Sequence, residues 1–164
     1  MNKFAKFGEE GVLALLSDST NVEREGFPIS DKEICETLVR IITASSGRVI
    51  VALFASNIAR IQVIVDIAKA KGKKIIFDGK SIEDSVRIAS ELGYLDTTDS
   101  KIISIDEVAD HGDEEIIIIT TGTQGEPMSA LARMSAGTHK QIKIKKGDTV
   151  VLSSKFIPGN EKAI

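Results

Sequence analysis

Small and polar residues gather in four short segments of the sequence, each directly after an aliphatic run. Such runs predict buried strands, so the segments are expected at the carboxyl ends of strands, where open α/β sheets bind ligands. The helices that follow would offer unpaired backbone N–H groups, and glycines would let the backbone approach a phosphate. The four segments are residues 54–57, 78–81, 121–128 and 153–160. Together they predict a phosphate-bearing ligand along one edge of the sheet.

The segment TGTQGEPM at residues 121–128 is the most specific of the four. Its glycines and its proline restrict the backbone, while threonine, glutamine and glutamate side chains offer hydrogen-bonding groups. No segment contains a Walker A sequence or Gly-x-Gly-x-x-Gly, so the best evidence for a nucleotide triphosphatase or a dinucleotide enzyme is missing. Ordinary turns and helix caps would explain any one segment alone. Four at one sheet edge favour a binding site.

Asp18 is the best candidate for a working carboxylate, because it directly follows the aliphatic run at residues 12–16. A carboxylate at a strand end can orient a histidine ring and stabilise its protonated form. No histidine lies nearby in the sequence. The alternative is that Asp18, with Ser19 and Thr20, forms a turn or a helix cap.

The remaining residues with possible chemistry are few. Two histidines and one cysteine cannot build a His/Cys zinc site of the usual kind. We expect His111 in a solvated acidic turn and His139 at the surface after a helix. The lysines within residues 140–146 form a basic strip that could meet RNA or keep an edge strand soluble. Cys35 is interpreted as a packing residue.

Length and composition indicate one globular domain. The chain has 164 residues, of which 42% are hydrophobic and 27% charged. A net charge of −3 is not that of a protein that holds nucleic acid by bulk electrostatics, so any polyanion must be held locally. No apolar run reaches the roughly 20 residues of a membrane span, and the N-terminus lacks the layout of a signal peptide. We therefore predict a cytoplasmic protein that contacts no membrane.

Strands and helices are predicted to alternate along the chain. The strands are nearly continuous aliphatic runs, typical of a parallel sheet buried on both faces, at residues 12–16, 48–54, 74–77, 115–120 and 149–153. Helices are predicted after the caps Ser30, Asn57 (or Ser56) and Ser81, and over residues 127–136, with a short helix and loop in the acidic stretch 106–115. The fold class is therefore α/β, a doubly wound, mainly parallel sheet with helices on both faces.

The two ends of the chain predict a piece of a longer protein. Residues 1–21 are interpreted as a strand segment that belongs to a neighbouring domain. Residues 156–164 are interpreted as a loop that enters a new helix.

Blocks of the sequence, in order, closely resemble the ribonuclease J family. They are LLSDSTN at 15–21, FASN at 54–57 followed by RIQ at 60–62, GKS at 79–81, TTGTQGEPMSAL at 120–131 and IPGNE at 157–161. The resemblance is to the β-CASP domain, a flavodoxin-like or Rossmann-like three-layer fold that this family inserts into a metallo-β-lactamase domain. It implies that residues 1–21 trail from the metallo-β-lactamase domain and that residues 22–164 form the β-CASP domain.

The resemblance implies a zinc-dependent ribonuclease that degrades RNA from the 5′ to the 3′ end, prefers a 5′-monophosphate and can also cut internally. Two zinc ions in the parent enzyme activate the attacking water. The family's His-x-His-x-Asp-His motif is absent from these 164 residues. We therefore expect no nuclease activity and no high-affinity zinc in this chain alone. The implied partners are RNA and the metallo-β-lactamase domain of the same parent chain, in a homo-oligomer.

The resemblance also implies roles for individual residues. Asp18 matches the family's acidic motif, where the carboxylate pairs with a histidine thought to transfer a proton. Residues matching segments that line the RNA channel are Phe54, Ala55, Ser56, Asn57, Arg60, Gly79, Lys80, Ser81, Thr121, Gly122, Thr123, Gln124, Gly125, Glu126, Pro127 and Met128. One alternative is a stand-alone, flavodoxin-like module that binds a nucleotide or phosphometabolite without catalysis. Another is a scaffold or dimerisation domain, which would have no affinity for phosphate.

Overall fold

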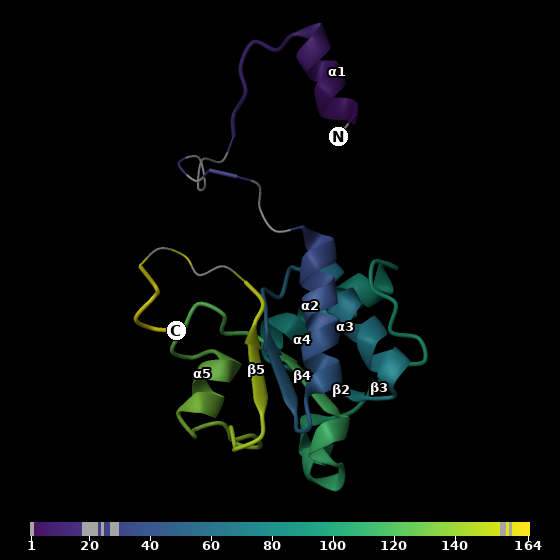
Figure 1. Ribbon diagram of the computed structural model, residues 1–164, viewed down its shortest axis with the longest axis vertical. Helices are drawn as coiled ribbons and strands as arrows, with labels where there is room; N and C mark the ends of the chain where they lie inside the picture. Colours follow the sequence, from purple (N-terminus) through teal and green to yellow (C-terminus); the bar gives the residue numbers. More distant parts are fainter. Residues whose placement is uncertain (1, 18–22, 24, 27–29, 155–156, 158) are drawn as a thin grey trace.

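A five-stranded parallel sheet lies at the centre of the part of the chain that the structure describes (Figure 1). The structure is a computed structural model that describes residues 2–17, 23, 25–26, 30–154, 157 and 159–164. The strand order is β3-β2-β4-β1-β5, and every pair is parallel. The strands are β1 (Val49–Ala52), β2 (Lys74–Asp78), β3 (Lys101–Ile102), β4 (Ile116–Thr120) and β5 (Thr149–Leu152). All carboxyl ends therefore meet at one edge of the sheet.

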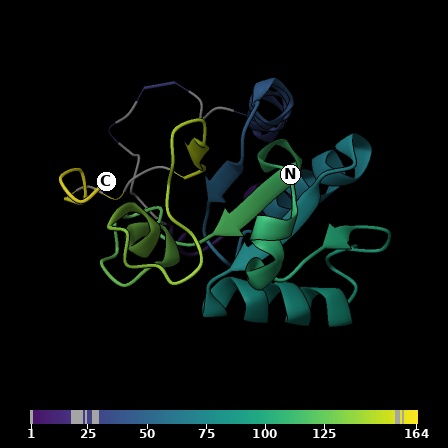
Figure 2. The same ribbon diagram turned by 90° about the horizontal axis from the view of Figure 1, so that it is seen from below.

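Helices cover both faces of the sheet. Alternate residues of a strand point to opposite faces, so Val49 and Val51 join one core and Ile50 and Ala52 the other. The first core is closed by α2 (Asp31–Ala44), α3 (Ile58–Lys71) and α4 (Lys80–Glu91). The second is closed by α5 (Ala130–Ser135) and the 3₁₀ helix η1 (Ile105–Asp110). Figure 2 shows α2, in blue, and α5, in olive green, on opposite sides of the strands. The predicted α/β fold is confirmed.

Local signals account for most of the helix boundaries. The Ser30 side chain accepts a hydrogen bond from the Glu33 backbone N–H, and the Asn57 side chain does the same for Arg60. The predicted cap at Ser81 is wrong, because the N-cap of α4 is Gly79, two residues earlier. The fourth predicted helix begins later than expected, at Ala130, since the Ser129 hydroxyl rather than Pro127 starts it.

The acidic stretch before β4, predicted as a short helix and a loop, forms η1 and a second 3₁₀ helix, η2 (Asp113–Glu115). The two-residue strand β3 was not predicted. Residues 161–163 make a turn, in which the Ala163 N–H donates to the Asn160 carbonyl at 2.9 Å.

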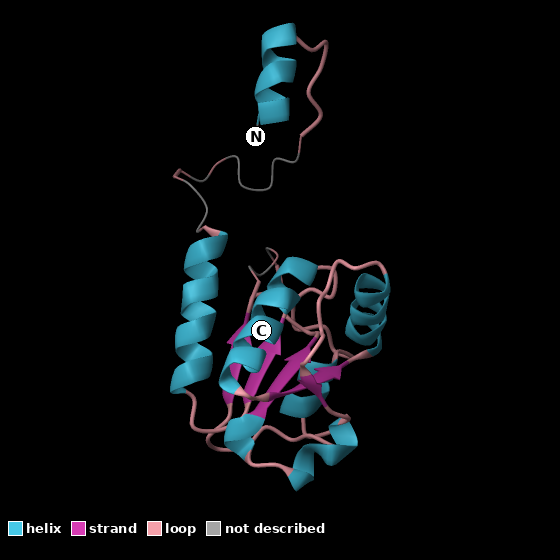
Figure 3. Cartoon of the chain, turned by 90° about the vertical axis from the view of Figure 1, so that its right-hand side faces the viewer, coloured by secondary structure: helices cyan, strands magenta, loops and turns pink. Residues whose placement is uncertain are grey.

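The predicted strand at residues 12–16 is wrong. Residues 11–17 form a loop that follows an unpredicted helix, α1 (Asn2–Glu10). Leu13 and Leu16 are almost fully exposed, and none of the five strands described pairs with this segment. A strand needs a neighbour for its backbone hydrogen bonds, so an aliphatic run alone does not make one. Figures 1 and 3 show α1 apart from the sheet. Assignment of residues 1–21 to another domain stays a prediction.

Within the described ranges, no helix combines the length and apolarity needed to cross a membrane.

Candidate functional site

The carboxyl ends of β2 and β4 open into a hollow of about 630 Å³, called here the β2–β4 hollow. Two of the predicted segments meet in it, 79–81 from the start of α4 and 121–128 from the loop before α5. The lining residues are Gly79, Lys80, Ser81, Asp84, Thr121, Glu126, Met128, Ser129, Ala130 and Arg133. Six of the sixteen residues predicted to contact RNA therefore share one cavity.

The start of α4 forms one wall of this hollow. Gly79 has a φ of 120°, which a residue with a side chain rarely adopts, and its carbonyl accepts from the Ile82 and Glu83 N–H groups at 3.0 and 3.1 Å. The N–H groups of Lys80 and Ser81 precede these bonds and have no partner within the helix. Both side chains are exposed. This wall therefore presents a helix N-terminus and a lysine to the hollow, and at that terminus the Glu83 carboxylate accepts from the Gly79 N–H at 3.3 Å.

The cationic and anionic side chains of the hollow differ in whether they have partners within the chain. It contains two cationic side chains, Lys80 and Arg133, and two carboxylates. Asp84 lies 3.7 Å from Arg87, and Glu126 accepts a hydrogen bond from the Gln124 N–H at 3.1 Å. In the part of the chain that is described, neither Lys80 nor Arg133 makes an ion pair, and the buried Arg133 Nε has no hydrogen-bond partner. Lys80 and Arg133 therefore have no counter-charge among the described residues, whereas each carboxylate has one partner within the chain.

The glycines of the 121–128 loop are required by packing. A Cβ atom at Gly122 would collide with the Ser129 side chain, and one at Gly125 would collide with the Ala163 carbonyl. Both glycines have positive φ, 113° and 70°. This packing agrees with the sequence interpretation that these glycines restrict the backbone, while their predicted contact with RNA stays a prediction. The glycines let the loop fold tightly against α5 and the C-terminal turn.

Gln124 lies inside the protein rather than on its surface. The residue is only 5% exposed. Its side-chain Oε1 accepts hydrogen bonds from the Ile157 N–H at 2.7 Å and from Asn160 Nδ2 at 3.4 Å. Its Nε2 lies 3.3 Å from Ser154 Oγ. Thr123 is likewise buried. Gln124 therefore joins the loop after β4 to the segment after β5, which is a shaping role.

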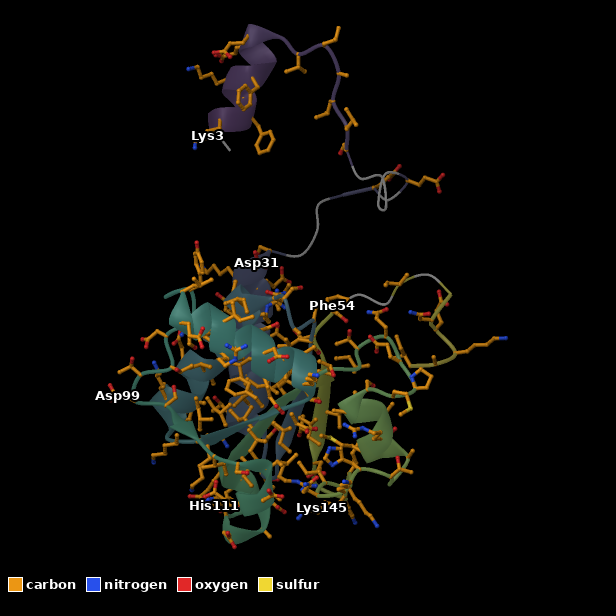
Figure 4. The ribbon with its side chains drawn as sticks, turned by 180° about the vertical axis from the view of Figure 1, so that it is seen from behind. Lys3, Asp31, Phe54, Asp99, His111 and Lys145 are labelled. Carbon is orange, nitrogen blue, oxygen red and sulfur yellow. The ribbon has the colours of Figure 1, made fainter. Side chains whose placement is uncertain are left out.

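The segment after β1 lies outside the β2–β4 hollow. Phe54, Asn57 and Arg60 line a separate cavity of about 500 Å³ between α2 and β5. Asn57 is occupied as the cap of α3, and the Arg60 guanidinium donates to Ser153 Oγ at 3.0 Å and to Asp31 Oδ1 at 3.2 Å. Phe54 is 43% exposed at this end of the molecule (Figure 4). Arg60 thus connects α3 to α2 and to the segment after β5.

The other predicted residues are spread around the same edge. Ser56 is exposed and lines a third, apolar hollow with Ile88, Leu92 and Tyr94, and Ala55 packs against the first core. Pro127 is exposed beside the β2–β4 hollow. Asp18 lies outside the described residues, so its predicted role in proton transfer stays a prediction.

The lysine strip and the shifted pKa values lie away from the hollow. Lys145 pairs with Asp113 at 2.8 Å, and Figure 4 shows Lys145 and His111 at the end of the molecule opposite Phe54. At the same amino edge, hydrogen bonds and charge from Lys74 lower the pKa of Glu115. Hydrogen bonds from Thr98 and Lys69 lower the pKa of Asp96, in the loop after α4.

One polar pair was missed by the sequence interpretation. His139, predicted at the surface, is buried, with its Nε2 3.1 Å from Oδ2 of Asp78, the last residue of β2. The N–H direction leaves that oxygen without a well-aligned hydrogen bond. No local pattern separates this histidine from an exposed one, because the pairing joins residues far apart in the chain.

Comparison with known proteins decides the family. Residues 46–164 match the family model described as ribonuclease J, beta-CASP domain. The chain belongs to the ribonuclease J β-CASP family. It is 48% identical over 160 residues to ribonuclease J of Mycobacterium tuberculosis, covering 98% of this chain and 29% of that protein. It is 46% identical over 162 residues to ribonuclease J of Thermus thermophilus, covering 99% and 28%.

A third relative is similar over the same range. Ribonuclease J2 of Bacillus subtilis is 44% identical over 161 residues, covering 98% of this chain and 29% of that protein. The chain thus spans less than a third of the length of these curated relatives of the ribonuclease J family. Among the described residues, no three His, Cys, Asp or Glu side chains are grouped so as to hold a metal ion.

Proposed function

We propose that this chain is the RNA-holding β-CASP domain of a ribonuclease J-type enzyme, and that the β2–β4 hollow binds a backbone phosphate of the RNA. The parent enzyme would degrade RNA from its 5′-monophosphate end and also cut internally. The observation that carries the proposal is the pair of unengaged cations, Lys80 and Arg133, beside the positive end of α4. Family membership supplies the substrate class.

The geometry suits a single strand better than a bulk polyanion surface. A phosphodiester carries one charge, and the hollow offers two cations with neighbouring backbone N–H groups. Met128 is 83% exposed at the rim, and Phe54 projects further along the same edge. Unstacked bases pack against such exposed aromatic and apolar side chains in single-strand binding. An RNA strand following the carboxyl edge would meet phosphate and base contacts in turn.

The metal chemistry of the parent enzyme would belong to its metallo-β-lactamase domain. When bound, zinc ions activate a water for attack on the phosphodiester. The described residues of this chain do not fit a metal, because no donor set gathers among them. The contribution of this chain is to bind and position RNA, with Asp18 proposed to orient a histidine of the complete site.

The proposal is tested by RNA binding to the 164-residue chain with matched lysine variants. Lys80→Gln should weaken binding of a 5′-monophosphorylated oligoribonucleotide and reduce the slope of log K against log[salt] by about 0.7, the value for one single-strand phosphate contact. Lys146→Gln, an exposed lysine at the opposite edge, is the control and should leave binding unchanged. Fluorescence anisotropy measures both.

Two outcomes would count against the proposal. Equal weakening by Lys80→Gln and Lys146→Gln would mean non-specific attraction. Tight binding of mononucleotides without oligonucleotide binding would favour a nucleotide-binding module. A separate assay with added zinc should show no nuclease turnover by this chain.

A further inference from the structure

Asp78 and His139 meet beneath the β2–β4 hollow. His139 is 6% exposed and Asp78 is 8% exposed, and their facing atoms, Nε2 and Oδ2, are 3.1 Å apart. A carboxylate buried at this depth is stable only if a donor or a cation compensates it. Among the described residues, His139 is the only basic side chain paired with the Asp78 carboxylate.

Backbone hydrogen bonds fix the orientation of the His139 ring. Its Nδ1 lies 3.1 Å from the Ile142 nitrogen and 3.3 Å from the Gln141 nitrogen, and both N–H groups donate to it. A ring nitrogen that accepts hydrogen bonds carries no proton, so a neutral His139 carries its proton on Nε2, the atom that faces Asp78. Ile142, fully buried in the second core, anchors this loop.

The pair connects the two walls of the hollow. Asp78 directly precedes Gly79 and Lys80, and its carbonyl accepts from the Thr120 hydroxyl at 3.0 Å. On the other side, the His139 backbone N–H donates to the Arg133 carbonyl at 3.0 Å. The Asp78–His139 contact therefore connects the wall at the start of α4 to the wall at α5.

We infer that Asp78 and His139 form a positioning pair that holds Lys80 and Arg133 at the spacing a phosphate needs, with His139 kept as the tautomer protonated on Nε2. This inference rests on the proposed function, because the spacing matters only if the hollow binds RNA. His139 touches no ligand itself and acts through the walls it joins.

The tautomer is tested on the unaltered chain by nitrogen-15 NMR of the histidine rings. The chain has two histidines, so a His111→Asn variant assigns the His139 signals. At pH 7.5 we expect an Nε2 shift typical of a protonated nitrogen and an Nδ1 shift typical of an unprotonated one. A proton on Nδ1, or rapid averaging between the two nitrogens, would overturn the pair. This measurement does not depend on whether a His139 variant folds.

Positioning is tested by RNA binding of two variants of His139. His139→Asn keeps an acceptor near the Nδ1 position but loses the contact with Asp78, and should weaken RNA binding about tenfold, because the two walls that carry Lys80 and Arg133 are no longer joined. His139→Gln places an amide near Nε2, and should restore binding to within about threefold of the unaltered chain. His111→Asn, the same change at the loop between η1 and η2, should leave binding unchanged.

The outcomes separate this inference from the proposed function. If the unaltered chain binds RNA and His139→Asn binds it equally well, the positioning role is wrong and the proposed function stands. If the unaltered chain binds no RNA, the proposed function and the positioning role both fail, while the ring-nitrogen shifts still decide whether the pair exists.

Discussion

A buried ion pair between Arg48 and Asp148 ties the amino end of β1 to that of β5. The guanidinium donates from Nε to Asp148 Oδ1 at 2.9 Å and from Nη2 to Oδ2 at 2.6 Å, and Nη2 also donates to the Lys143 carbonyl at 2.8 Å. The two side chains are 7% and 1% exposed. We predict that Asp148→Asn will destabilise the fold, because it leaves the Arg48 charge buried without its counter-charge.

The magnitude follows from the burial of both groups. Removing one partner of a buried pair costs about 3–5 kcal/mol, and the asparagine keeps one acceptor, so we expect about 3 kcal/mol. For a chain of this size each kcal/mol lowers the melting temperature by about 2–4 °C, which gives a fall of about 6–12 °C. Urea denaturation followed by far-UV circular dichroism measures the free energy of unfolding. An exposed pair supplies the control: Glu36→Gln, one turn after Lys32, should give no resolvable change.

The same pair predicts how stability depends on pH. Burial alone would raise the pKa of Asp148, but hydrogen bonds from Arg48 and the Lys145 N–H, with their charges, lower it below the ordinary 3.8. The hydrogen bond to Asp148 in turn raises the pKa of Arg48. A carboxyl whose pKa is lower in the folded state stabilises the fold above its unfolded pKa, and this contribution is lost as pH falls through the folded value. Below about pH 4, the free energy of unfolding of Asp148→Asn should therefore fall less with decreasing pH than that of the unaltered chain.

Two results would refute the reasoning. If Asp148→Asn lowers the free energy of unfolding by less than about 1 kcal/mol, the pair contributes no more than a surface ion pair. The double variant Arg48→Met/Asp148→Leu should be more stable than Asp148→Asn, because no charge remains buried. If the double variant is less stable than Asp148→Asn, the destabilisation comes from altered side-chain packing rather than from a buried unpaired charge.

Further predictions concern the loop and the site. Gly122→Ala should destabilise the fold by about 1–3 kcal/mol, since the new methyl group meets Ser129 and a φ of 113° is strained for alanine; thermal unfolding checks this. Gln124→Ala should cost about 1–3 kcal/mol and make the chain after β5 more susceptible to limited proteolysis, because the buried amide bonds to Ser154 and Ile157; unchanged cleavage would contradict it. Arg133→Gln should weaken RNA binding as Lys80→Gln does, in the same anisotropy assay.

The elements of the fold were predictable because their signals are local. Ser30 and Asn57 cap helices through bonds to residues three positions ahead, and aliphatic runs such as residues 116–120 are buried on both faces of the sheet. The run at residues 12–16, VLALL, is also aliphatic but forms a loop, since strand formation depends on a pairing partner that an aliphatic run does not specify. β3 has two residues, too few for any periodic signal.

The loops of the candidate site could be predicted, but the orientations of their side chains could not. The sequence placed the right loops at one sheet edge, but it could not tell a polar side chain that faces a ligand from one that faces the protein. Gln124 and Asn57 have the chemistry to contact RNA and are instead occupied inside the structure. His139 was predicted at the surface and is buried against Asp78. Each of these outcomes depends on contacts between residues far apart in the chain.

The net charge of −3 becomes compatible with RNA binding once the engagement of each charge is considered. At the β2–β4 hollow the carboxylates of Asp84 and Glu126 are held by Arg87 and by a backbone N–H, so their charges are partly compensated within the protein. Lys80 has no such partner among the described residues. Coulomb interactions between exposed groups are screened beyond about 10 Å, so the local balance decides what binds there, and the acidic η1 and η2 at the opposite edge have little influence.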